Sequence, residues 1–104
     1  MVQTDSENND LVGSKAIDAN GTKIGMVTDV VHDPESGRPE WAVIDPGLLK
    51  AEHYAPLGEA YRSSTDDLVL DLDKRFVTSA PKAPRDHEIT PQLEEELHHY
   101  YDRT

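Results

Sequence analysis

The sequence contains no cysteine. Disulfide bonds, thiolate zinc sites, iron–sulfur clusters and cysteine nucleophiles are therefore excluded. Aromatic residues are also scarce, with one tryptophan, one phenylalanine and four tyrosines in 104 residues. Only 36% of the residues are hydrophobic, which is low for a globular chain, so part of the chain is expected to lie outside a core.

The sequence also has no long apolar run and few positively charged residues. No run approaches the roughly 20 residues of a membrane-spanning helix, and the first residues resemble no signal peptide, so we expect a cytoplasmic protein without a transmembrane segment. Ten basic residues face 21 acidic ones, which gives a net charge of -11. Such a chain repels nucleic-acid phosphates and anionic lipid. We therefore expect no direct nucleic-acid binding. A basic protein partner fits this charge, and peripheral membrane association remains open.

Composition shifts divide the chain into four segments. Residues 1–10 hold no large apolar cluster and are expected to form a disordered acidic arm. Residues 11–80 carry short apolar segments separated by turn residues and predict one β domain. A Pro-containing linker is expected at 81–89, followed by a C-terminal helix at 90–104.

The β domain begins with a hairpin signal. Asn20-Gly21 favours a type I′ turn between strands at 14–17 and 23–31. The apolar alternation of the second strand slips once, and a bulge at Gly25 restores its register.

Further short strands follow at intervals of roughly ten residues. They are expected at 41–44, 53–57 and 68–72, with Pro56 at a sheet edge, and a single helical turn is expected at 74–77. This pattern predicts a mainly β protein, a small antiparallel barrel or sandwich with a C-terminal amphipathic helix, and a barrel is favoured because closure removes exposed sheet edges.

The C-terminal helix has clear boundary signals. Thr90 is a suitable N-cap, and Pro91 suits the first helical position. An apolar stripe follows at helical spacing, formed by Leu93, Leu97, Tyr100 and Tyr101. Because so short a helix is marginal alone, the stripe must pack on the barrel or on a second copy of the chain.

Motifs for catalysis or metal binding are not found. The residues after Asp18 miss the spacing of a calcium loop, and adjacent His98 and His99 point about 100° apart on a helix, so they form no shared metal site. Serine nucleophile motifs and phosphate-binding glycine loops do not occur. We expect no enzyme activity, no catalytic residue, no metal and no cofactor.

Large aromatic and apolar side chains are the candidates for partner binding, because such residues form interface hot spots. In so small a protein most of them are also needed in the core, and the sequence alone does not separate the two roles. The candidates are Trp41, Tyr54, Tyr61 and the helix stripe of Leu93, Leu97, Tyr100 and Tyr101.

Several of these segments together resemble the PRC-barrel domain family. The run 11–31 is similar to its opening hairpin, with Gly21, Ile24, Gly25, Val27, Asp29 and Val30 on its motif positions. Residues 41–44 resemble the apolar strand of the family, and 55–57 resemble its "vPl" segment. Residues 76–81 and the late helix resemble the ending of stand-alone bacterial members.

The resemblance implies a small antiparallel barrel of about six strands that serves as an interaction module without a catalytic constellation. Such domains occur in the reaction-centre H subunit and in a ribosome maturation factor, where the domain contributes to binding a ribosomal protein. We therefore expect a non-catalytic protein-binding adaptor, with itself as a homodimer or a basic protein as partner. The alternatives are a ribosome-assembly-type factor and a peripheral regulator of a membrane electron-transfer complex.

Overall fold

The computed structural model describes residues 11–102 of the chain. These residues form six strands and two helices: β1 (Lys15–Ile17), β2 (Lys23–His32), β3 (Pro39–Asp45), β4 (His53–Pro56), β5 (Tyr61–Arg62), β6 (Leu68–Val69), α2 (Lys74–Thr78) and α3 (Pro91–Tyr101). The expected acidic arm at 1–10 lies outside the described residues.

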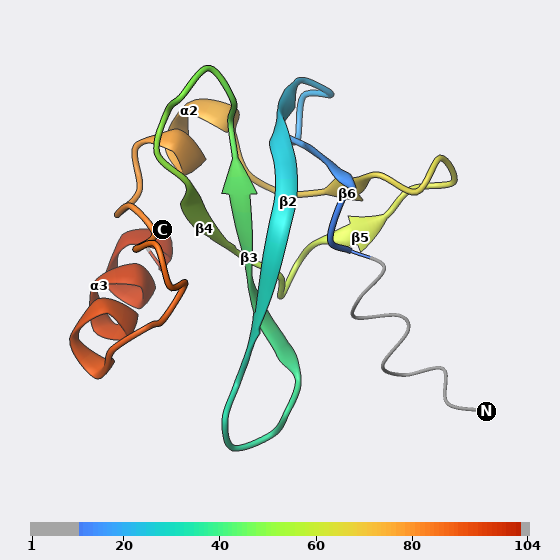
Figure 1. Ribbon diagram of the computed structural model, residues 1–104. Coiled ribbons are helices and arrows are strands. Elements are labelled where there is room, and N and C mark those ends of the chain that lie inside the picture. Colours follow the sequence, from blue (N-terminus) through green and yellow to red (C-terminus); the bar gives the residue numbers. More distant parts are fainter. Residues whose placement is uncertain (1–10, 103–104) are drawn as a thin grey trace.

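One six-stranded sheet has the order β4-β3-β2-β1-β6-β5 (Figure 1). The long β2–β3 hairpin runs through its middle, α2 lies at one end of it, and α3 lies beside β3 and β4. The edge strands β4 and β5 are not paired with each other, so the sheet is barrel-like but open. The mainly β fold with a C-terminal helix is thus confirmed. Neighbouring strands are antiparallel except β1 and β6, whose parallel pairing differs from the antiparallel arrangement expected.

The turn between β1 and β2 corrects one prediction. Only Gly21 of the Asn20-Gly21 pair has a positive φ, of 85°, whereas a type I′ turn needs two such residues. The loop instead closes on Asp18, whose carbonyl accepts from the Gly21 amide and whose Oδ1 accepts from the amides of Asn20 and Thr22. Asp18 Oδ2 also accepts from the Lys74 amide at 3.0 Å. These bonds outweigh the cost of burial and lower the pKa of Asp18, so this carboxylate joins the hairpin to α2.

The strand expected at 68–72 is shorter in the structure, because β6 ends at Val69. The predicted apolar face is nevertheless present, since Leu68 and Leu70 are buried and Leu72 packs against the same core. The Leu70 amide still donates to the Ile17 carbonyl at 2.9 Å, after which the chain turns toward α2. The chain thus leaves the sheet while its side chains continue to fill the core.

Strand β3 is buried on both faces. Ala42 and Ile44 belong to the core inside the curved sheet, while Trp41 and Val43 belong to a second cluster on the opposite face. This explains why the run reads as continuously apolar rather than alternating. The second cluster exists because α3 covers it.

Helix α3 begins at the predicted position, ends at Tyr101 rather than at residue 104, and packs on its own sheet. The Thr90 side chain accepts from the Leu93 amide, and Pro91 occupies the first turn. Leu97 is completely buried against the second cluster, and Tyr101 donates to the Tyr54 carbonyl at 2.5 Å. The apolar stripe of α3 therefore packs on the sheet of the same chain. Neither α2 nor α3 is long and apolar enough to cross a membrane.

Residues 81–89 run beside β4, and the side chain of His87 bridges two carboxylates of the sheet region. Lys82 pairs with His53, and the Ala83 amide donates to the Glu52 carbonyl. His87 then places Nδ1 2.9 Å from Asp29 Oδ2 and Nε2 2.8 Å from Glu52 Oε1. Partial burial opposes protonation of His87, but these two carboxylates outweigh it and raise the pKa of His87 above its usual value. The imidazolium thereby ties the segment before α3 to the sheet.

Because of the His87 bridge, we expect the free energy of unfolding to depend on pH. The pKa of His87 is raised in the folded state. Its contribution to the free energy of unfolding is therefore complete below the pKa of the unfolded state, about 6.5, and is lost as pH rises through the pKa of the folded state. His87→Asn suits the positive φ at this position and is expected to cost about 1 kcal/mol at pH 6 and distinctly less at pH 9. Urea unfolding at both pH values measures the difference, with the exposed His32→Asn as control. An equal cost of His87→Asn at both pH values would contradict the imidazolium bridge.

Candidate functional site

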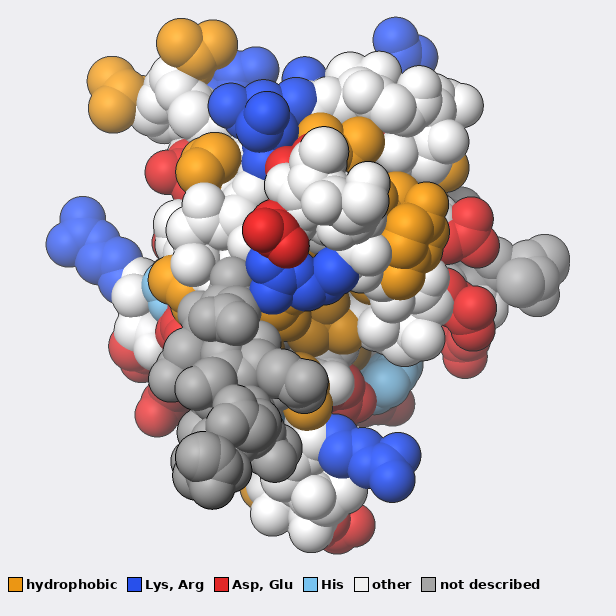
Figure 2. Space-filling view, turned by 90° about the vertical axis from the view of Figure 1, so that its right-hand side faces the viewer, with side chains coloured by type: hydrophobic (Ala, Val, Ile, Leu, Met, Phe, Trp, Pro, Cys, Tyr) orange, Lys and Arg blue, Asp and Glu red, His pale blue; other side chains and the backbone are white. Residues whose placement is uncertain are grey.

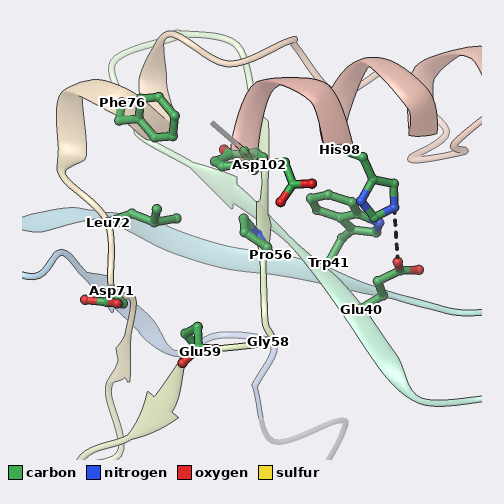
Figure 3. A pocket seen from close by; sticks show the side chains of 12 residues that line it. Glu40, Trp41, Pro56, Gly58, Glu59, Asp71, Leu72, Phe76, His98 and Asp102 are labelled. Carbon is green, nitrogen blue, oxygen red and sulfur yellow. Dashed lines mark ion pairs between the residues drawn. The ribbon is translucent and has the colours of Figure 1, made fainter. Parts of the chain in front are cut away.

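A pocket of about 560 Å³ lies where α3 meets the open side of the sheet (Figure 3). Its walls come from five separate parts of the chain: β3, the end of β4 with the connection to β5, the segment after β6, α2 and the end of α3. The lining residues are Glu40, Trp41, Pro56, Gly58, Glu59, Ala60, Asp71, Leu72, Phe76, His98, Tyr101 and Asp102.

The apolar part of the pocket is held by the aromatic residues of the two helices. Phe76 of α2 stacks on Tyr100 of α3, with ring centroids 4.5 Å apart. The Tyr100 hydroxyl donates to the Phe76 carbonyl at 2.6 Å, so the two helices are connected by both contacts. The ring centroids of Tyr101 and Trp41 lie 6.0 Å apart, and these two rings form the adjoining wall of the pocket. These contacts keep the pocket open and shaped within a single chain.

The rim of the pocket is acidic. Figure 3 shows Glu59 and Asp71 on one side of Trp41 and Pro56, Glu40 of β3 beside His98, and Asp102 near the end of α3. Partial burial raises the pKa of Glu40, and the negative charges of Glu94 and Asp33 raise it further, against the opposing effect of His98. Negative charge is therefore crowded around Glu40, and a positive charge beside this carboxylate would relieve the repulsion.

Positive charge gathers on a different part of the surface. Figure 2 shows Lys and Arg side chains gathering at the top of one face, the end at which α2 and the β1–β2 turn lie in Figure 1. Leu48 and Leu49, in the loop after β3, are among the most exposed apolar side chains. The acidic pocket and the exposed leucines are thus separate features of the surface.

The structure separates the seven partner-binding candidates. Trp41 and Tyr101 line the pocket, but Trp41 is only 2% exposed and belongs to the second cluster, and Tyr61 lies exposed on β5. Tyr54 and Leu97 are fully buried and serve the core, so they are not surface residues of the monomer. Leu93 is half-buried against the second cluster, and Tyr100 is half-buried on Phe76.

Sequence reasoning missed the acidic rim. Asp71 follows β6 and lines the pocket, whereas Asp73 caps α2 by accepting from the Arg75 amide. Glu40 and Glu59 had no local pattern that distinguishes them from other surface acids. They line one pocket because the sheet and the two helices assemble in three dimensions, which a single sequence does not reveal.

Comparison with known proteins agrees with this architecture. A model of the PRC-barrel domain matches residues 4–77, which is 74 of the 104 residues. A search of the curated proteins finds no match. The match covers all six strands of the sheet and most of α2. On this evidence the chain belongs to the PRC-barrel domain family.

Proposed function

We propose that this protein is a non-catalytic protein-binding module whose pocket receives a basic segment of a partner that carries one apolar or aromatic side chain. The observation that carries the proposal is the combination of an apolar pocket with an acidic rim. The apolar anchor would contact Leu72 and Phe76, while Lys or Arg side chains beside it would face Glu59 and Asp71.

The lining favours binding over covalent catalysis. Among the described residues that form the pocket, no serine, threonine or lysine stands beside His98 as a nucleophile. Its volume of about 560 Å³ suits one large side chain with its flanking backbone. The net charge of -11 would also speed the approach of a basic partner at low salt.

Two further proposed partners are a basic ribosomal protein and a second copy of the chain. A basic ribosomal protein is one case of the partner chemistry proposed here, so an assembly factor is its nearest specific form. The expected homodimer stays a prediction, and solution scattering at high concentration tests it, because a compact monomer would contradict it.

A peptide selection tests the proposed function. Random peptides of about twelve residues are displayed and selected on the full chain at low salt. The expected binders combine several Lys or Arg residues with one aromatic or large aliphatic residue, and their affinity falls as salt is added. The paired reversal Glu59→Lys with Asp71→Lys is expected to weaken such a peptide by about tenfold or more.

A matched variant separates the pocket from net charge. Glu35→Lys with Glu96→Lys changes the total charge equally, at exposed positions outside the pocket lining. This control is expected to retain most of the affinity. Equal weakening in both variants, or binders without basic residues, would contradict a specific acidic pocket.

A further inference from the structure

Three metal-ligating side chains meet beside the pocket. Glu40 comes from β3, while Glu94 and His98 come from α3, and one ligand atom of each lies within 4.8 Å of the other two. His98 Nε2 is 3.6 Å from Glu40 Oε2 and 3.7 Å from Glu94 Oε2. Figure 3 shows the pair formed by His98 and Glu40.

The arrangement follows from the fold. Glu94 and His98 are four residues apart on α3 and therefore project from the same face of the helix. Packing of Leu97 on the sheet turns that face toward the beginning of β3, where Glu40 lies. The His98 ring is further oriented by its edge contact with Trp41, at a centroid distance of 5.4 Å.

The spacing of these atoms fits a small divalent cation. Ligand atoms about 2.1 Å from a tetrahedral zinc ion lie about 3.4 Å from one another. The two distances to His98 Nε2 exceed this value by only a few tenths of an ångström. Side-chain rotation can supply such a change, because all three side chains are partly exposed, at 29% for Glu40, 45% for Glu94 and 55% for His98.

We propose that Glu40, Glu94 and His98 bind a divalent transition-metal ion such as Zn²⁺, with the remaining coordination position open to solvent or to the pocket. One imidazole nitrogen and two carboxylate oxygens suit zinc, whereas calcium and magnesium prefer oxygen ligands alone. The crowded carboxylates also favour a cation electrostatically. The site goes beyond the proposed peptide binding and does not depend on it.

The same helix offers an internal control. Glu95 and His99 have the same four-residue spacing as Glu94 and His98, and both are exposed. They are not part of the cluster with Glu40. A metal that merely used any glutamate–histidine pair on the helix would respond equally to both pairs.

Metal titration of the full chain, made without a histidine tag and treated with a chelator, tests the site. Calorimetry with Zn²⁺ is expected to give one ion per chain, and Co²⁺ is expected to give the visible absorption of a low-symmetry site. His98→Ala and Glu40→Gln should each weaken Zn²⁺ binding at least tenfold, whereas His99→Ala and Glu95→Gln should change it less than threefold. Melting curves of the metal-free variants check that each is folded.

Two results would overturn the site. The first is the absence of saturable Zn²⁺ binding to the folded wild type at millimolar concentration, which would leave only an ion-pair cluster. The second is equal weakening by His98→Ala and His99→Ala, which would indicate unspecific binding along the helix. Peptide binding by the metal-free protein is a separate measurement, so failure of the metal site is distinguishable from failure of the proposed function.

Discussion

Leu97→Ala is expected to lower the free energy of unfolding by about 3 kcal/mol. Leu97 is fully buried between α3 and the sheet, where it packs with Trp41, Val43 and Tyr54. Truncation to alanine removes this contact and leaves a cavity in a cluster that has few other members. For a domain of this size the melting temperature should fall by roughly 15 °C.

Trp41 provides a direct reporter for this variant, because it is the single tryptophan of the chain and is 2% exposed beneath α3. Loosening of the helix should shift its fluorescence to the red before the sheet unfolds. The neighbouring exposed Glu96→Ala is the control and should stay within about 0.5 kcal/mol of the wild type. A cost below 1 kcal/mol for Leu97→Ala would contradict packing of α3 within one chain.

Gly25→Ala is expected to cost about 3 kcal/mol or more. A Cβ atom at this position would lie 2.2 Å from the carbonyl oxygen of Asp45 and 2.8 Å from Cα of Pro46. Both atoms belong to the backbone, so no side-chain rotation relieves the clash and the strands must separate. Gly25 also pairs with Ala16 next to the register shift between β1 and β2, so the displacement would reach the first core cluster.

Gly58→Ala is the matched control for this substitution. A Cβ atom at Gly58 meets no atom within 4 Å. Its φ is not positive, so alanine should be neutral or slightly stabilising there. Chemical denaturation of both variants gives the comparison. A Gly25→Ala protein as stable as Gly58→Ala would mean that β2 and the end of β3 do not approach each other this closely.

Local pattern was sufficient for the elements that are defined by neighbouring residues. Turn residues indicate the hairpin of β1 and β2, and apolar side-chain spacing indicates the strand at 41–44. Capping by Thr90 indicates the start of α3. A register shift was also predicted beside Gly25, and the structure places it opposite the step from Ala16 to Ile17.

Long-range arrangement was not accessible in the same way. The parallel pairing of β1 with β6 joins segments about 50 residues apart, and no local signal marks it. The Asn20-Gly21 pair suggested a two-residue turn, but Asp18 accepts two amide hydrogen bonds and favours a longer loop. The pocket depends on how the sheet and the two helices assemble, so its acidic rim appears only once these elements are placed.

We propose that the acidic pocket beside α3 is the binding surface, and amide chemical-shift mapping with a selected basic peptide tests this proposal. The largest shifts are expected on pocket residues, among them Glu59, Leu72 and Asp102, and they should vanish in the paired Glu59→Lys and Asp71→Lys variant. Largest shifts around Leu48 and Leu49, or shifts that persist in that variant, would contradict it and place binding on another face.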